Sequence, residues 1–299
     1  MMTTPIPNHG LLVLDKPRGP SSHQVTAWAG EILGKRVGHA GTLDPGVSGV
    51  LVVMIGNAVR LAPVLLSEEK EYIAVIRFHK NVGETAVRSV AEEFIGRIYQ
   101  RPPLKSAVAR NLRIRTIHAL DVLEVGERLA VLRITCDAGT YIRSLCHHMG
   151  LSLGCGAHME ELRRTRSGVF SEDSAHTLAE LKDAAALARQ GKFEALTTMI
   201  MPPGMVAGGL PTLVIRDTAV DALCHGAALA GVGVIRQDPF QRGDVVAMLT
   251  SEGELVCIGE AIVSSSMVTP GMHGLVAAPR SVFLPPGTYP RGWKKGHKA

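Results

Sequence analysis

The sequence predicts an α+β protein built from two domains, a larger one of strands and helices followed by a small β-barrel. Helical and β-like segments are mixed along the first 200 residues, as in α+β folds. The stretch from Met201 to Pro211 has glycine or proline at six of its eleven positions, which is typical of a linker. Short β-like runs at close spacing follow this stretch, and they indicate a barrel.

The first domain begins with a helix that Ser21 or Ser22 can cap and that Gly34 ends. A glycine-dense loop over residues 38–49 then leads into the β-branched run Val50–Ile55, which predicts a loop followed by a buried strand. The further expected elements are a strand over Tyr72–Phe78, a helix over Val87–Ile95, a hairpin over Arg113–Thr135 broken at Gly126, a helix from near Thr140 through Met149, and a helix over Leu178–Arg189.

The second domain is expected from four short runs that turn residues separate. These runs are Thr212–Ile215, Val245–Leu249, Leu255–Ile258 and Ala261–Val263. Since they all follow the linker, the domain boundary is placed within it.

The composition is that of a globular protein. Hydrophobic residues make up 46% and charged residues 20%, which excludes a disordered or collagen-like chain. The longest apolar stretch, Val50–Ile55, is far shorter than the roughly 20 residues that cross a bilayer, so no membrane span is expected. The first residues carry no basic leader and their apolar run stops at Asp15, which argues against a secretory signal. We therefore expect a cytoplasmic protein.

Basic residues exceed acidic ones, 32 to 27, and they gather in two segments that contain no acid. One segment is Arg97–His118 and the other is Ser281–Ala299. A polyphosphate partner favours such segments, because each basic contact releases counterions from the nucleic acid. The alternative is a solvated face and a loose tail. The residues of these segments that we take as candidate nucleic-acid contacts are Arg101, Lys105, Arg110, Arg113 and Arg291.

Metal, nucleotide and serine-hydrolase chemistry find little support. The five cysteines include no CxxC pair, and the CxxH formed by Cys155 and His158 has no second pair nearby. The glycine-dense loop lacks the Lys-Ser/Thr of a P-loop, and Ser48 lacks the final glycine of a nucleophile elbow. Neither a metal nor a cofactor is predicted.

Asp44 is the remaining candidate for chemistry, because it lies between Leu43 and Pro45 inside the flexible loop. An acid there can also be a simple turn cap. Three polar outliers bear on it: His39 in the same loop, Tyr72 at the start of a strand, and Arg143 on the side of its helix that we expect to be buried. An arginine beside a half-buried carboxylate keeps it ionised, as a nucleophile or electrostatic stabiliser requires.

Five runs in the same order resemble the signature segments of the TruB-type RNA pseudouridine synthases. They are Leu14–Pro17, Gly38–Pro45, Lys70–Tyr72, Gly139–Arg143 and Ala157–Arg164. The segment Gln100–Val108 runs straight into Arg110–Ile117 without the insertion typical of bacterial members, so the chain resembles the archaeal dyskerin-type branch. That branch supplies the catalytic subunit of H/ACA guide ribonucleoproteins. Residues after the linker resemble the PUA domain, a small RNA-binding barrel, at Gly226–Leu229, Gly243–Val245, Gly259–Ala261 and Tyr289–Trp293.

This resemblance implies a catalytic domain with a central mixed or antiparallel sheet flanked by helices, followed by the PUA barrel. It divides the chain into an N-terminal arm (1–10), the catalytic domain (11–205), the PUA domain (206–293) and a basic tail (294–299). Two departures stand out. Val232 replaces a usual proline, and His79-Lys80-Asn81 replaces an acidic pattern.

The resemblance also implies roles for single residues in converting uridine to pseudouridine, a reaction that needs no cofactor. Asp44 would be the catalytic carboxylate, attacking the sugar or the ring or removing a sugar proton, and Arg143 would pair with it. Tyr72 would stack on the flipped uracil, and its phenol is a candidate for helping to remove the proton from carbon five. The remaining implied contacts are Leu162 as a pocket wall, His39 against the displaced nucleotide, Lys16 as a support for the active-site loops, and Arg163 and Arg164 as contacts to RNA.

The implied partners are an H/ACA guide RNA, rRNA and tRNA substrates, small Nop-type and Gar-type proteins, and a kink-turn-binding homologue of a ribosomal protein. In this family the PUA barrel and the N-terminal arm grip the guide RNA. Two alternatives stay open. One is a guide-independent tRNA pseudouridine synthase. The other is a non-catalytic RNA-binding scaffold in which Asp44 only caps its loop.

Overall fold

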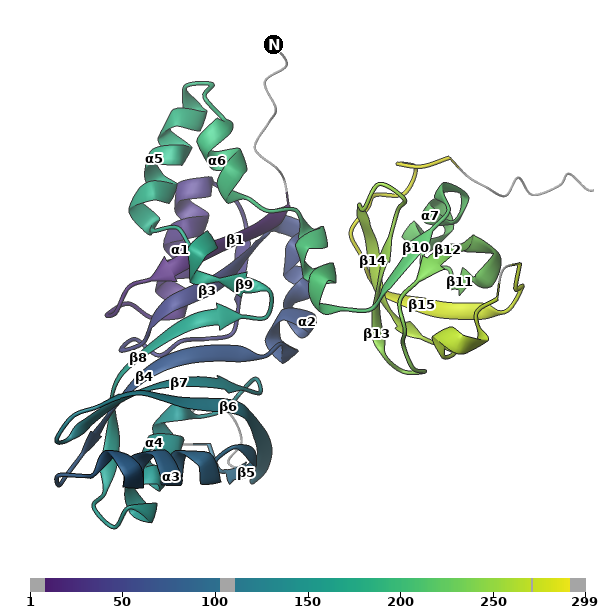
Figure 1. The fold of residues 1–299 in the computed structure, drawn as a ribbon. Coiled ribbons are helices and arrows are strands. Elements are labelled where there is room, and N and C mark those ends of the chain that lie inside the picture. The colour runs from purple at the N-terminus through teal and green to yellow at the C-terminus, as the bar shows by residue number, and fades with distance from the viewer. Residues whose placement is uncertain (1–8, 103–110, 270, 291–299) are drawn as a thin grey trace, which may run out of the picture. The chain divides into compact units, whose positions relative to one another are not determined.

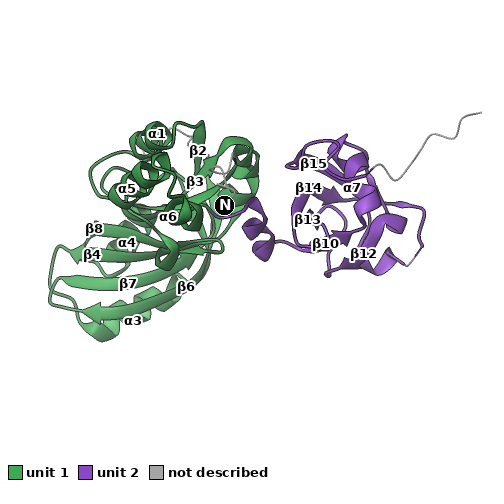
Figure 2. Cartoon of the chain, turned by 90° about the horizontal axis from the view of Figure 1, so that it is seen from above, with its two compact units in different colours: residues 1–200 green, residues 201–299 purple. Residues whose placement is uncertain are grey.

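A computed structural model describes residues 9–102, 111–269 and 271–290. The chain divides into two compact units, Met1–Ile200 and Met201–Ala299 (Figure 2). Each unit has a sheet and a hydrophobic core of its own.

A large mixed sheet forms the first unit (Figure 1). Seven of its strands follow the order β1-β3-β8-β4-β7-β6-β5, with β2 paired to β3 and β9 to β8. Strand β3 pairs with β8 in parallel and with β1 in antiparallel fashion, and the other pairs are antiparallel. The strands are β1 (Gly10–Lys16), β2 (Val37–Ala40), β3 (Ser48–Ile55), β4 (Lys70–Phe78), β5 (Gly96–Gln100), β6 (Arg113–Val125), β7 (Leu129–Cys136), β8 (Ala157–Ser167) and β9 (Phe170–Ser171).

Helices cover the two halves of this sheet separately (Figure 1). Helices α1 (Ser22–Leu33), α5 (Leu178–Arg189) and α6 (Glu194–Met199) share a core with β1 and β3. Helices α3 (Glu84–Glu93) and α4 (Ile142–Ser152) share a second core with β4, β6 and β7. The short α2 (Ala62–Ser67) connects β3 to β4. The two halves of the sheet meet at the parallel pair of β3 and β8.

The helix ends follow from capping chemistry. Ser21 and Gln24 form a capping box at the start of α1, and Gly34 ends it with a left-handed φ of 62°. Thr177 and Glu180 form the same box at α5. The predicted helices and the hairpin are confirmed, although α3 begins at Glu84, and α4 begins at Ile142. Strands β1, β5 and β8 were not among the predicted elements.

The second unit is a six-stranded sheet, counted over the described residues, in the order β11-β15-β14-β13-β10-β12. It curves into a nearly closed barrel, with α7 (Asp217–Cys224) packed on its core. The predicted strands at Thr212–Ile215 and Val245–Leu249 are confirmed at those bounds, whereas β15 was not predicted. The strands are β10 (Thr212–Ile215), β11 (Leu229–Ala230), β12 (Val234–Gln237), β13 (Val245–Leu249), β14 (Leu255–Ala261) and β15 (Leu275–Val282).

No helix in the described parts of the chain is long and apolar enough to span a membrane. The five cysteines are free thiols, and Cys136, Cys146 and Cys257 are buried.

Candidate active site

The loop that carries Asp44 joins β2 to β3 and is fixed to α1. The hydroxyl of Ser22, buried in the first turn of α1, accepts a 2.8 Å hydrogen bond from the amide of Leu43 and donates one of 2.9 Å to its carbonyl. The amide of Val47 donates to the carbonyl of Asp44 and closes a turn around Pro45. Asp44 therefore lies on a loop whose backbone is held on both sides.

Arg143 reaches this loop from the first turn of α4. Its Nη2 donates a 2.7 Å hydrogen bond to Oδ2 of Asp44, and the two side chains form an ion pair. The expected pairing of these residues is confirmed. Their expected burial is wrong, because the Asp44 side chain is 60% exposed and that of Arg143 is 51% exposed.

The helical repeat explains why Arg143 is exposed. The buried stripe of α4 contains Ile142, Leu145, Cys146 and Met149. Arg143 follows Ile142 and is turned by about 100° from it, which points the side chain past the edge of this stripe. In the free protein the carboxylate of Asp44 therefore faces water. A bound substrate would remove it from water.

Tyr72 lies on β4, where its neighbours across the ladder are Ile134 and Arg164. It is half-buried and packs against the core that β4 shares with α4. Burial raises the pKa of its phenol above the ordinary value of 10, and the nearby positive charge of Arg164 opposes that rise. The phenol therefore stays protonated at neutral pH and is a poor base there. Leu162 of β8, paired with Ala74, packs against the same core.

Lys16 is completely buried at the end of β1. Its Nζ donates a 2.7 Å hydrogen bond to the carbonyl of Val47 and one of 2.9 Å to that of Pro17. Burial lowers the pKa of Lys16, and the carboxylate of Asp44 acts in the opposite direction. Lys16 holds the loop after Asp44 and has no access to solvent.

His39 lies in β2 between two threonines. Its Nδ1 is 3.1 Å from Oγ1 of Thr26 and its Nε2 is 3.3 Å from Oγ1 of Thr42, while its ring meets that of His23 edge to face. Burial lowers the pKa of His39 below its ordinary value of 6.5, and His23 and Arg164 add to the effect. The imidazole is therefore neutral at pH 7.

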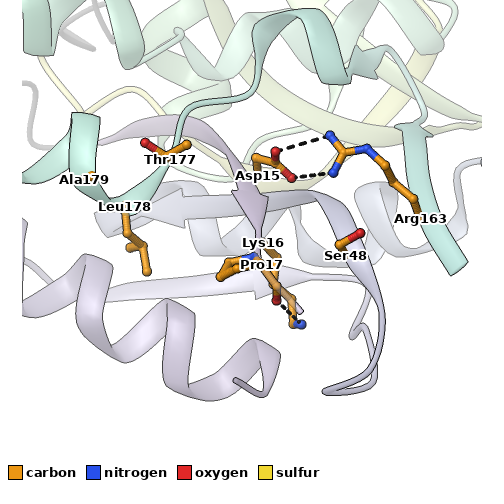
Figure 3. A pocket seen from close by; sticks show the side chains of 8 residues that line it. All are labelled: Asp15, Lys16, Pro17, Ser48, Arg163, Thr177, Leu178 and Ala179. Atoms are coloured by element: carbon orange, nitrogen blue, oxygen red, sulfur yellow. Dashed lines mark hydrogen bonds and ion pairs between the residues drawn. The ribbon is translucent and has the colours of Figure 1, made fainter. Parts of the chain in front are cut away.

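Two arginines of β8 that we expected to contact RNA have other partners. Arg164 is only 1% exposed and its guanidinium donates to the carbonyls of Val50 and Gly41, so that expectation is wrong for this residue. Arg163 donates to both carboxylate oxygens of Asp15 and also to Glu172, beside a hollow of about 330 Å³ at the end of β1 (Figure 3). The alternation of apolar and polar residues along a strand could not predict these partners, because β8 is polar along most of its length.

The other predicted RNA contacts lie around β5 and β6. Arg101 is exposed just after β5, and Arg113 is half-buried at the start of β6. Lys105, Arg110 and Arg291 lie outside the described residues, as do the basic tail and residues 1–8 of the N-terminal arm.

Sequence reasoning missed Lys70, which is 3% exposed at the start of β4. Its Nζ donates to the carbonyls of Leu65 and Glu68, and burial lowers its pKa to about 8. Lys70 is followed by Glu71, and this pair of charged residues is equally typical of an exposed lysine, so the sequence did not predict its burial. No cluster of three metal-ligating side chains occurs within the residues that the structure describes.

A carboxylate held by a guanidinium on a loop of a mixed sheet, with a protonated phenol two strands away on β4, is suited to acid, base or nucleophilic chemistry on a polar substrate. The barrel that follows has the strand plan of a small RNA-binding domain. Together they fit an RNA-modifying enzyme, as the resemblance to the pseudouridine synthases implies.

Comparisons with protein families agree. The chain matches the TruB family pseudouridylate synthase N-terminal domain over residues 31–142, the tRNA pseudouridylate synthase B C-terminal domain over 143–205 and the PUA domain over 211–283. It is 49% identical to a probable tRNA pseudouridine synthase B of Methanothermobacter thermautotrophicus, over 95% of this chain and 89% of the relative. A protein of the same name from Methanosarcina barkeri is 46% identical, over 96% and 86%. The chain belongs to the TruB family and is an RNA pseudouridine synthase.

Solved structures share this fold over nearly the whole chain. One chain of an H/ACA ribonucleoprotein bound to a substrate RNA containing 2′-deoxyuridine matches with a TM-score of 0.89 and 42% identity, over 95% of this chain and 88% of that one. A chain of a Cbf5-Nop10-Gar1 complex matches with a TM-score of 0.90 and 44% identity, over 94% and 87%. The expected family, fold and enzyme class are thereby confirmed.

Proposed function

We propose that this enzyme is the catalytic subunit of an H/ACA guide ribonucleoprotein that isomerises uridines of rRNA, and that it also modifies the T-loop uridine of tRNA. The structures that it matches are described as H/ACA and Cbf5-Nop10-Gar1 complexes, which supports the guided activity. The relatives are named for a tRNA activity, which supports the second. The observation that carries the catalytic assignment is the 2.7 Å pair of Asp44 and Arg143 on a braced loop.

The reaction breaks the bond between the uracil nitrogen and the sugar, turns the base, and joins its carbon five to the same sugar carbon. The proton of carbon five is lost to water, and the freed ring nitrogen takes one up, so the product is an isomer of uridine. Asp44 is the carboxylate that acts on the sugar or on the ring, and Arg143 fixes the direction in which that carboxylate points. Since the pair is exposed in the free protein, an extruded nucleotide has open access to it. Extruding the uridine costs a few kcal/mol, which contacts to the RNA backbone offset.

Other residues complete the pocket in this proposal. Tyr72 stacks on the uracil, and its protonated phenol donates or relays a proton rather than acting as a free base. Leu162 is the apolar wall that keeps water from the detached base. Neutral His39 lies against the displaced nucleotide, and Lys16 keeps the loop of Asp44 in place.

The proposed partners are a guide RNA that selects the target by base pairing and small proteins of the Nop10 and Gar1 kinds. A kink-turn-binding homologue of a ribosomal protein completes the particle. Arg101 and Arg113 are proposed to contact RNA from β5 and β6, together with Lys105, Arg110 and Arg291. Because the relatives come from archaea, whose cells have no nucleus, we place the reaction in the cytoplasm.

Release of tritium from uridine labelled at carbon five tests the assignment. The complex reconstituted with a guide RNA and its partner proteins is expected to release tritium at the guided position, and the protein alone to release it from tRNA. Asp44→Asn is expected to abolish release with RNA binding retained, whereas Asp121→Asn, a change at an exposed position of β6, leaves release unchanged.

Each alternative gives a different result in this experiment. Activity on tRNA without any guided activity would identify a stand-alone tRNA enzyme. Tight RNA binding with no release from either RNA would identify a scaffold. Undiminished turnover of Asp44→Asn would remove Asp44 from the chemistry.

A further inference from the structure

Arg164 is the largest fully buried side chain among the described residues, and it touches three elements of the active site. From its place on β8, its Nε donates a 2.8 Å hydrogen bond to the carbonyl of Val50 in β3. Its Nη2 donates one of 2.8 Å to the carbonyl of Gly41, three residues before Asp44. Tyr72 is its register partner on the neighbouring strand β4, so the two side chains lie on the same face of the sheet. Arg164 therefore holds the loop of the carboxylate with its guanidinium and lies opposite the phenol in the sheet.

The charge of this guanidinium is not neutralised by a contact with a carboxylate. None of the ion pairs in the described parts of the chain includes Arg164, and none includes Lys16, the other fully buried cation near the loop. A buried charge without a paired carboxylate is costly, and an apolar side chain of similar volume avoids that cost. Stability alone therefore does not account for an arginine at this position.

Two glycines shape the backbone around Arg164. Gly41 has a φ of 79°, and a Cβ on it would lie 3.1 Å from Nη1 of Arg164. Gly49 has a φ of 101°, and a Cβ on it would lie 2.1 Å from the Arg164 carbonyl oxygen. Both positions therefore require glycine for the backbone to approach the arginine this closely. Part of the glycine content of the loop is thus explained by Arg164 and not by a phosphate.

We infer that Arg164 is a positioning residue for the reaction, which fixes the loop of Asp44 relative to Tyr72 by holding the carbonyls of Gly41 and Val50 from a position directly opposite Tyr72 in the sheet. This inference rests on the proposed roles of Asp44 and Tyr72. Its physical basis is that the guanidinium offers several donors in fixed directions, whereas an ammonium group offers a single point of charge. A displacement of about 1 Å between reacting groups costs on the order of a hundredfold in rate.

The test compares Arg164→Met and Arg164→Lys with Arg166→Met, a matched control two residues along the same strand. Arg166 donates to the carbonyl of Gly168 and pairs with Glu69, and no hydrogen bond among the described residues joins it to Gly41 or Val50. Single-turnover tritium release at saturating protein gives the rate constant, and filter binding of the same labelled tRNA gives Kd. Arg164→Met is expected to lower the rate constant by about a hundredfold with Kd changed less than about threefold. Arg164→Lys is expected to restore part of the rate, and Arg166→Met to match the unchanged protein.

The lysine variant keeps the buried charge and most of the volume, so it remains informative if the methionine variant unfolds. A normal rate constant in either Arg164 variant overturns the inference, and so does a loss that appears only in Kd. Asp44→Asn is measured in the same series. If that variant keeps its turnover, the proposed function fails. If it loses turnover while the Arg164 variants do not, only the role of Arg164 fails.

Discussion

The carboxylate of Asp44 accepts a 2.7 Å hydrogen bond from the guanidinium of Arg143, although 99 residues separate them in the chain. Both side chains are more than half exposed, and an ion pair of this kind contributes at most about 1 kcal/mol to stability. The pair is therefore better suited to orienting a reactive group than to holding the fold together.

The first prediction follows from this pair. Arg143→Met is expected to lower product formation at neutral pH by at least about a hundredfold, because the carboxylate loses the group that directs it. Its midpoint of thermal unfolding is expected to stay close to that of the unchanged protein, because the pair is exposed. Arg143→Lys keeps the positive charge but loses the planar guanidinium with its fixed donors. Its rate of product formation is expected to lie between those of the unchanged protein and Arg143→Met. Normal product formation in Arg143→Met would show that the pair has no part in the reaction.

The second prediction concerns the pH dependence of Tyr72. Burial raises the pKa of this phenol above 10, so it carries its proton throughout the range from pH 6 to 9. The rate ratio between the unchanged enzyme and Tyr72→Phe is therefore expected to be constant over that range. Single-turnover rates at each pH measure the ratio. A ratio that grows about tenfold with each pH unit would mean instead that the phenolate is the active form.

The sequence carried enough information to predict the elements whose signals are local. The apolar repeat alone predicted helix α5, and its bounds at Leu178 and Arg189 were predicted correctly. The hairpin of β6 and β7 turns at the predicted Gly126. Such signals lie within one element and do not depend on the rest of the fold.

The burial of Arg164, Lys16 and Lys70 could not be predicted from the sequence pattern. Strand β8 contains glutamates and arginines along most of its length, yet it lies between β3 and β4 in the middle of the sheet. Arg164 is buried there because carbonyls of Gly41 and Val50 accept its protons, and those carbonyls come from distant segments. Its burial follows from tertiary contacts that no local periodicity records. The same reason explains why the residues around Lys70 did not indicate its burial, and why Lys16 was singled out only through the family resemblance.

The third prediction uses Lys70, whose pKa falls from the ordinary 10.5 to about 8 on burial. Between these two values the unfolded chain holds a proton that the folded protein has lost, so this group makes the protein more stable as pH rises from about 8 to 10.5. The difference in pKa corresponds to about 3 kcal/mol. Below pH 8 both states are protonated, and the cost of burying the charge is present in full.

Denaturant unfolding of the unchanged protein and of Lys70→Met at pH 7 and pH 10.5 measures this effect. The free energy of unfolding of the unchanged protein, relative to that of the variant, is expected to rise by about 3 kcal/mol between the two pH values. Lys182→Met, at an exposed position of α5, controls for the general loss of a positive charge. A difference that stays constant or falls with pH would mean that Lys70 is not desolvated.

The last prediction concerns the contact of β3 with β8. A Cβ at Gly49 would lie 2.1 Å from the carbonyl oxygen of Arg164, and the φ of 101° there is one that alanine rarely adopts. Gly49→Ala is therefore expected to lower the free energy of unfolding by about 3 kcal/mol or more. Gly46→Ala is the matched control, since a Cβ there meets nothing within 4 Å, and it is expected to change stability by less than about 0.5 kcal/mol. Equal stability of the two variants in denaturant unfolding would show that β3 moves away from β8 freely, and the carbonyl of Val50 would then be no fixed anchor for Arg164.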